Sequence, residues 1–238
     1  IELNKNYYQA YNNLGIIFKQ EKNLQEAEHF FKCAFKINSK HYQSLTNLGL
    51  LTQLKNNHLE AINYFTNSYK IQFNDESLIY FGNSLINYRF IEPRADLYKI
   101  IYDLITIKNL VSPTSVIKSI ISLIIQEDEI NKVLNSENHF NSISEFNNTI
   151  NALSKYHFFL EIMKLCPLTD YKFEKLFVKM RFYLLKNISV INLSELNQNF
   201  LIALVSQCFV NEYIYYETEI EIKQINELEI LINKNLSL

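Results

Sequence analysis

YQAYNNLGIIFKQEKNLQEAEHFFKCAFKINSKH, residues 8–41, is followed directly by a second version of itself, YQSLTNLGLLTQLKNNHLEAINYFTNSYKIQFND, residues 42–75. Eleven of the 34 aligned pairs are identical. The identical pairs include Leu14/Leu48, Gly15/Gly49, Glu26/Glu60, Ala27/Ala61, Phe31/Phe65 and Ile37/Ile71. A tandem repeat of this length predicts a stack of helix pairs, because each pair can bury its apolar face only against its neighbours.

The residue types within each copy fit two helices joined by a short polar turn. The predicted turns are Glu21-Lys22-Asn23 in the first copy and Lys55-Asn56-Asn57 in the second. Small residues are needed where the two helices cross closely, and Gly15, Gly49, Ala27 and Ala61 supply them. Large residues, Leu14, Phe18, Phe31 and Ile37, follow a helical spacing and are expected to fill the space between helices.

These features resemble the tetratricopeptide repeat (TPR), whose signature is W-x2-L-G-x2-Y, then A-x3-F, then P. The first copy reads Tyr11-x2-Leu14-Gly15-x2-Phe18 and then Ala27-x3-Phe31, and the second keeps Leu48-Gly49 and Ala61-x3-Phe65. The copies depart from the signature at the closing proline, which is Ser39 or Phe73, and at Thr52, which replaces an aromatic residue. The resemblance implies an all-α TPR superhelix that binds a protein or a peptide.

The repeat frame extends in both directions, so we expect TPRs over residues 1–108. Residues 1–7 match the end of an earlier, truncated repeat, which suggests a fragment of a longer protein. Residues 76–108 are expected to be a divergent repeat, because Leu78-x2-Phe81-Gly82 fits its first helix. In its second helix Ala95 falls one residue late, and Pro93 is expected to open the helix at its first turn.

Residues 109–238 are expected to form a second, packed helical region. No segment alternates polar and apolar residues as a half-buried strand does, and the chain has 3 Gly and 3 Pro. The linker is expected at 135–148, which is rich in Asn, Ser and Glu. The expected helices are 113–125, 127–134, 149–165, 170–187, 194–213 and 217–234, with Thr169-Asp170 starting the fourth of these and Ser194 capping the fifth.

Part of this region, residues 160–222, resembles a helical segment of certain bacterial proteins. Its motif stretches are Lys164-Leu-Cys166-Pro167-Leu-Thr-Asp170 and Gln207-Cys208-Phe209-x-Asn211-Glu212-Tyr213. In those proteins the segment lies between N-terminal TPRs and a C-terminal class I S-adenosylmethionine-dependent methyltransferase domain. The resemblance implies a catalytic domain beyond Leu238, which would hold the S-adenosylmethionine.

The composition argues against several functions for this chain itself. A net charge of −2 is not that of a nucleic-acid binder led by bulk charge. All three glycines are repeat glycines, so no Gly-rich cofactor or phosphate loop is expected, and we predict no catalytic residue and no cofactor here. None of the five histidines has a zinc-like spacing, so no metal site is expected.

The expected environment of the chain is the cytoplasm. Three dispersed cysteines, Cys33, Cys166 and Cys208, are expected to be free thiols in a reducing compartment. No run reaches the ~18 apolar residues that a membrane-spanning helix needs, so no membrane contact is expected.

The expected binding surface is the TPR groove, which one face of each repeat's first helix lines. The candidate residues are Gln9, Asn12, Ile16, Lys19, Gln20, Gln43, Thr46, Leu50 and Gln53. Clamps for acidic peptide termini use several cations in this place, whereas this set has Lys19 alone, so an extended or helical peptide is the better candidate. The alternative is that the repeats only pack against the second half.

A polar cluster, Asn211, Glu212 and Tyr213, follows the near-continuous apolar run 200–210. It could tie its helix to neighbouring helices, contact a following domain or, as a third alternative, take part in catalysis. The tail 211–238 has six Glu and two Lys, which gives a local net charge of −4. We expect it to form a solvated amphipathic helix or a docking face for a missing domain.

The functional hypotheses come from different classes. The first is a scaffolding segment that recruits a protein or peptide substrate for a C-terminal methyltransferase domain. The alternative is a stand-alone TPR adaptor or assembly protein without an attached enzyme. A third is an enzyme whose site lies in the second half.

Overall fold

The computed structural model describes residues 7–107, 110–136, 140–187, 191, 197–210, 219 and 222–223, with the side chains of 209 and 210 left out. These residues are all-α, as the sequence predicts, and contain no strand. The chain divides into two compact units, residues 1–119 and 120–238. The predicted repeat end at 108 and the helix at 217–234 fall largely outside the described residues.

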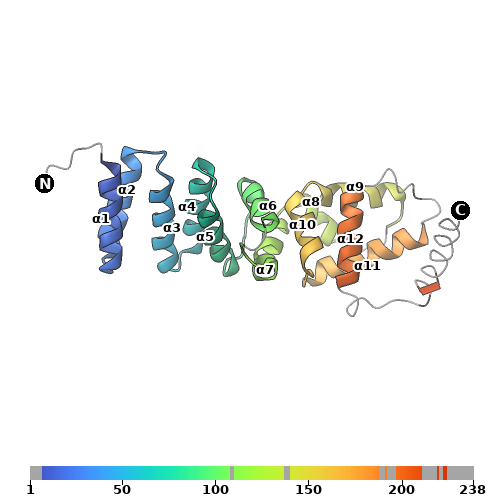
Figure 1. The fold of residues 1–238 in the computed structure, drawn as a ribbon. Coiled ribbons are helices and arrows are strands. Elements are labelled where there is room, and N and C mark those ends of the chain that lie inside the picture. The colour runs from blue at the N-terminus through green and yellow to red at the C-terminus, as the bar shows by residue number, and fades with distance from the viewer. Residues whose placement is uncertain are drawn as a thin grey trace, which may run out of the picture. The chain divides into compact units, whose positions relative to one another are not determined.

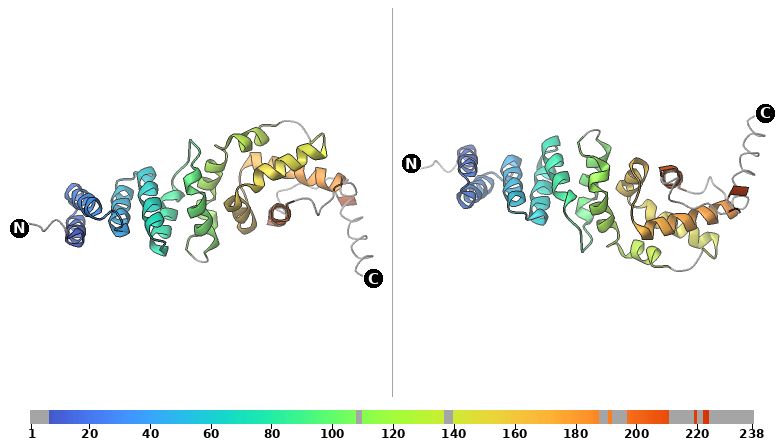
Figure 2. Two further views of the ribbon diagram at one scale, coloured as in Figure 1. Left: turned by 90° about the horizontal axis from the view of Figure 1, so that it is seen from above. Right: turned by 90° about the horizontal axis from the view of Figure 1, so that it is seen from below.

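Unit 1 contains the predicted helix pairs in chain order (Figures 1 and 2). Its helices are α1 (Tyr8–Gln20), α2 (Leu24–Ile37), α3 (Tyr42–Leu54), α4 (His58–Ile71), α5 (Asp75–Ile86), the 3-10 helix η1 (Ala95–Leu97), α6 (Tyr98–Thr106) and the first part of α7 (Pro113–Ile124). The first helices of the three repeats are thus α1, α3 and α5. The second helices of the two regular repeats are α2 and α4.

The turn within each repeat is built the same way in both regular copies. Lys22 and Asn56 take left-handed backbone angles, φ 63° and 57°. The residue after each of them caps the next helix: Asn23 Oδ1 accepts from the amide of Glu26, and Asn57 Oδ1 from that of Glu60. The left-handed residue reverses the chain, and the cap satisfies an amide that the helix leaves unpaired.

The repeat glycines are needed for a close helix crossing. A Cβ atom added to Gly15 would lie 2.5 Å from Cε1 of Phe31, and one added to Gly49 would lie 2.5 Å from Cε1 of Phe65. Both phenylalanines are fully buried, so the rings have no free space to move into. Each copy thus packs a ring directly on the glycine of its partner helix.

The third repeat departs from this plan, as its sequence predicts. A Cβ atom on Gly82 would meet Cγ2 of Val111 at 2.6 Å, with no phenylalanine in the usual place. Ala95 is exposed, and the neighbouring Leu97 is fully buried instead. The prediction that Pro93 opens the second helix is wrong, because Pro93 lies in the loop and η1 begins only at Ala95.

Unit 2 holds the end of α7, then α8 (Asp128–Leu134), α9 (Ile143–Ser154), α10 (His157–Leu165), α11 (Tyr171–Lys186) and α12 (Gln198–Val210). The predicted helix over 149–165 is in fact two helices, α9 and α10, with a break at Lys155 and Tyr156. The predicted linker 135–148 is too long, because α9 starts at Ile143. Ser142 caps α9 by accepting a hydrogen bond from the Glu145 amide at 3.2 Å.

The starts of the last two described helices follow from their caps. Asp170 Oδ1 accepts from the amides of Lys172 and Phe173, at 3.0 and 3.2 Å, which confirms the predicted start of this helix. The last helix, α12, begins at Gln198, with Asn197 Oδ1 accepting from the Phe200 amide at 3.0 Å. The predicted start at 194 and its cap Ser194 lie outside the described residues.

A buried side-chain amide on α12 hydrogen-bonds to the end of α10. Gln207 is fully buried, and its Oε1 accepts from the Leu168 amide at 3.0 Å. Its Nε2 donates to the carbonyl of Cys166 at 2.8 Å and also to the carbonyl of Met163. In a helix, the carbonyl of Met163 would accept a hydrogen bond from the N–H four residues later. That residue is Pro167, which has no N–H, and Gln207 donates to this carbonyl instead.

The same corner buries a thiol. Cys166 is 2 % exposed, and its burial raises the pKa of the thiol to about 11. A thiol with that pKa is protonated at neutral pH, so Cys166 is a packed apolar group rather than a nucleophile.

Candidate binding surfaces

The nine residues predicted to line the TPR groove lie on α1 and α3 but differ in exposure. Gln9, Gln20 and Gln43 are exposed. Ile16, Lys19, Leu50 and Gln53 are half-buried, and Ile16 packs against the core cluster around Phe31. The remaining two, Asn12 and Thr46, are 8 % and 6 % exposed.

Asn12 and Thr46 hydrogen-bond to the next repeat. Ser44 Oγ donates to Asn12 Oδ1 at 3.4 Å, and the Thr46 and Ser77 hydroxyls lie 3.3 Å apart. Asn12 and Thr46 occupy the same repeat position, and so do Ser44 and Ser77. The same polar contact therefore recurs at both junctions between first helices, and it engages these two candidates within the unit.

Three further residues extend this surface, which we call the first-helix face. Leu54 is 64 % exposed at the end of α3, in the repeat position of Gln20. Asn13 and Asn83 are exposed too, and Asn83 on α5 takes the position of Leu50. The repeat register, carried to the last residue of α3 and into the third copy, is the signal that finds Leu54 and Asn83.

A second surface is a groove between the second helices α2 and α4, with α3 beneath it. The groove has a volume of about 710 Å³. We call it the second-helix groove; its lining residues are Lys32, Phe35, Lys36, Ser39, Leu45, Leu48, Tyr64, Asn67, Lys70 and Ile71. Sequence reasoning did not find it, because its residues look like the solvated side of two ordinary amphipathic helices.

All charged residues that line the second-helix groove are positive. Its lining includes three lysines and no carboxylate. Lys32 Nζ lies 2.5 Å from a carboxylate oxygen of Glu28, which also pairs with Lys55 at 2.5 Å. These pairs lower the pKa of Glu28, and the same hydrogen bond raises the pKa of Lys32. Lys36 and Lys70 occupy the same repeat position, in the last turns of α2 and α4.

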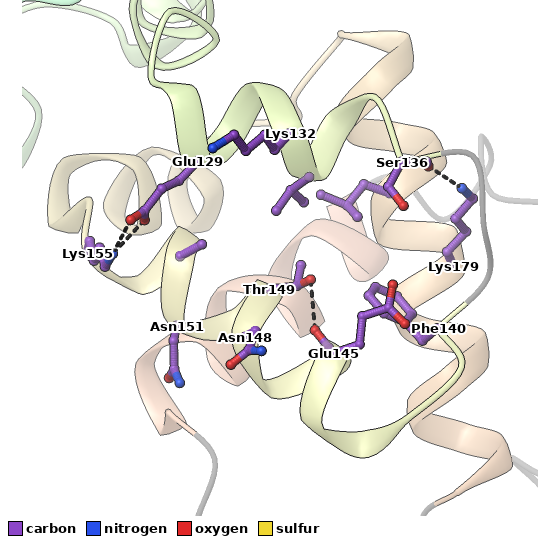
Figure 3. A pocket seen from close by; sticks show the side chains of 13 residues that line it. Glu129, Lys132, Ser136, Phe140, Glu145, Asn148, Thr149, Asn151, Lys155 and Lys179 are labelled. Carbon is purple, nitrogen blue, oxygen red and sulfur yellow. Dashed lines mark hydrogen bonds and ion pairs between the residues drawn. The ribbon is translucent and has the colours of Figure 1, made fainter.

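Unit 2 has a third surface, a groove of about 490 Å³ among α8, α9 and α11 (Figure 3). At one end Glu129 and Lys155 form an ion pair of 2.5 Å. At the other end Lys179 Nζ donates to the Ser136 carbonyl at 3.1 Å. The lining carries three lysines and two glutamates, and Glu129, Lys155 and Lys179 already have partners. Charges of both signs therefore largely offset one another in this groove.

The described residues contain no group of three or more His, Cys, Asp or Glu that could hold a metal ion. Within the same residues no helix is long and apolar enough to cross a bilayer. The candidate interdomain residues Asn211, Glu212 and Tyr213 lie outside the described part of the chain.

Comparison with known families agrees with the first helix pair. The tetratricopeptide repeat family matches residues 8–41, which are α1, α2 and the turn after them. No curated protein matches the chain. Residues 8–41 are therefore similar to a TPR, and the all-α structure continues the same helix-pair plan into residues 42–75. TPRs generally mediate protein–protein interaction and scaffolding.

Proposed function

We propose that unit 1 is a peptide-binding module that holds a segment of a partner protein on the first-helix face. The TPR match supports this proposal, because stacked helix pairs present an extended surface that such proteins use for binding. The proposed partner is a protein rather than a nucleic acid, in line with the net charge of −2.

The observation that carries the proposal is an exposed aliphatic side chain among amides. Leu54 is 64 % exposed and follows the half-buried Leu50 by one helical turn. Exposed amides of Gln20 and Gln43 belong to the same face. Apolar side chains can take up the apolar side chains of a peptide, while neighbouring amides can pair with its backbone. Lys19 is the one cation of the nine predicted residues, so the proposed peptide needs no acidic terminus.

The test is a selection of peptides against the full chain, followed by binding measurements with variants. Leu54→Ser and Gln43→Ala together are expected to weaken the selected peptide about tenfold or more, without lowering the melting temperature. Ile91→Ser is the matched control, since Ile91 is an aliphatic residue of the same unit, 83 % exposed in a loop. A peptide that both variants bind equally well would contradict the proposal.

A finer proposal is that the chain is the recruitment arm of an S-adenosylmethionine-dependent methyltransferase whose catalytic domain follows Leu238. Its support is the resemblance of residues 160–222, together with one contact. Gln207 comes from one motif stretch of that resemblance, and it hydrogen-bonds to Cys166 and Leu168 of the other. The two motif stretches are therefore in contact with each other in the structure.

The reading frame beyond Leu238 tests this finer proposal. A Gly-rich strand–turn–helix there, and methylation of peptides that bind the first-helix face, are the expected results. A frame without such a domain would leave the alternative, a stand-alone TPR adaptor. The proposed setting of either protein is the cytoplasm, where the free cysteines Cys33, Cys166 and Cys208 would stay reduced.

A further inference from the structure

We infer that the second-helix groove is a separate docking site, and that its occupant is an acidic amphipathic helix of a partner protein. The groove is formed by α2 and α4 with α3 beneath, whereas the proposed peptide site lies on the first helices. The inference is therefore independent of the proposed function of the first-helix face.

The floor of the groove is apolar. Leu45 and Leu48 of α3 lie beneath it, 4 % and 2 % exposed. Phe35 and Tyr64 are half-buried, and Ile71 is 37 % exposed at its edge. Water in contact with Phe35, Tyr64 and Ile71 would be released by an apolar partner, and this release favours binding.

The rim of the groove sets the charge of the occupant. Lys32, Lys36 and Lys70 line the groove without an opposing carboxylate in its lining, although the chain as a whole carries a net charge of −2. Such a local excess of one sign selects a partner of the opposite sign and speeds its approach. Glu28 pairs with Lys32, and Glu60 and Asp96 act on Lys32 and Lys70 from outside the lining, so these carboxylates partly offset the positive charge of the rim.

A cation in the last turn stabilises its own helix, and Lys36 and Lys70 both occupy last turns. That effect explains the two charges singly. It does not explain why Phe35, Tyr64 and Ile71 are left partly uncovered between them.

The backbone around the groove favours a helix over an extended peptide. The walls are the helices α2 and α4, 14 residues each, whose backbone groups bond within the helices. An extended peptide would find few donors or acceptors here, whereas a helix satisfies its own backbone. A third helix can also place its side-chain ridges between two neighbouring helices.

The experiment uses the full chain and a fluorescein-labelled synthetic helix of about 20 residues, with leucine on one face and glutamate on the other. Binding is followed by fluorescence anisotropy at low and high salt. Lys36→Glu combined with Lys70→Glu is expected to raise the dissociation constant about tenfold or more. Added salt is expected to weaken binding to the unaltered chain, because rim charges are exposed to screening.

The control changes the same charge elsewhere in unit 1. Lys99 and Lys118 are exposed on α6 and α7, so Lys99→Glu with Lys118→Glu alters the net charge equally and leaves the groove intact. Probe binding to this variant should stay within twofold of the unaltered chain. Equal weakening by both double variants, or equal binding of a scrambled probe of the same composition, would overturn the inference.

The chain's own acidic tail is a competing occupant. Replacing five of its six glutamates, Glu217, Glu219, Glu221, Glu227 and Glu229, with glutamine should leave probe binding unchanged if the groove serves a partner. A tenfold tighter binding of the probe to that variant would show that the tail already competes for the groove. That outcome would overturn the assignment to a partner protein.

Discussion

The two regular repeats and unit 2 each have a specific contact that joins two helices, and these contacts differ in kind. In the repeats one contact recurs: Gly15 lies against Phe31, and Gly49 lies against Phe65 at the same distance. In unit 2 one side chain, Gln207, bonds to three backbone groups at the end of α10. Damage to one repeat contact leaves a second copy intact, whereas Gln207 has no such copy among the described residues.

The largest expected effect follows from removing that amide. Gln207→Leu would leave the buried Leu168 amide and the carbonyls of Met163 and Cys166 without the bonds that Gln207 makes. Each buried group that loses its partner costs about 1–3 kcal/mol, so we expect unfolding of unit 2 to become easier by about 3 kcal/mol or more. Thermal and urea melts of the full chain measure it.

The control is on the same helix. Gln198 is exposed at the start of α12, so Gln198→Leu should change the free energy of unfolding by less than about 0.5 kcal/mol. If both leucine variants melted alike, the idea that one amide holds α12 would fail.

The next effect compares a regular repeat with the divergent one. Ala61 is fully buried where α3 and α4 cross, so Ala61→Leu should overpack the crossing and cost about 1–3 kcal/mol. Ala95 is exposed, so Ala95→Leu should cost almost nothing. Chemical denaturation of both variants tests the contrast. Equal losses would mean that the third repeat keeps the crossing of the first two.

A smaller effect tests whether the two regular copies are equivalent. Asn23→Ala and Asn57→Ala each remove a cap, and each should cost about 1 kcal/mol. Asn83→Ala, on an exposed position of α5, is the control that removes an asparagine without a cap. If the melting temperatures of the two cap variants differed by several degrees, the two copies would contribute unequally to the stability of unit 1.

The smallest effect concerns the left-handed turn residues. Lys22→Gly should stabilise the chain by about 0.5 kcal/mol, because glycine adopts a positive φ without steric cost. Asn56→Gly should change less, since asparagine tolerates this conformation better than lysine. A loss of stability in Lys22→Gly would mean that the lysine side chain makes a compensating contact.

The sequence predicted the repeat part of the fold well, because periodicity and local chemistry agree there. The turns at Lys22 and Asn56 and the crossings at Ala27 and Ala61 are where the repeat frame puts them. In the third copy the frame found α5 but misjudged the second helix. A loop takes up the space before η1, and Leu97 replaces the expected alanine in the core.

The errors in unit 2 have local causes. The polar stretch before Ile143 was assigned to a loop by composition, although Ser142 and Glu145 have the spacing of a helix cap. The break between α9 and α10 lies at Lys155 and Tyr156, where no glycine or proline marks it. Tyr156 is 8 % exposed, so packing of this ring, rather than a turn residue, accompanies the break.

The binding surfaces were predictable only in part. The register identified the first helices, but it could not show that Asn12 and Thr46 would be used between repeats. The second-helix groove was beyond reach, because Lys36 and Lys70 are 34 residues apart and read singly as helix-end cations. Only the stacking of α2 beside α4 brings them to one groove.

The buried thiol of Cys166 can report local opening at the end of α10. Cys166 is 2 % exposed and its thiol is protonated at neutral pH, so an alkylating reagent must wait for a local opening that exposes the sulfur. When closing is faster than the reaction of the exposed thiol, the alkylation rate reports the equilibrium between the closed and the open form of this corner. Cys33 is only half-buried, so its thiol serves as the more accessible reference in the repeats.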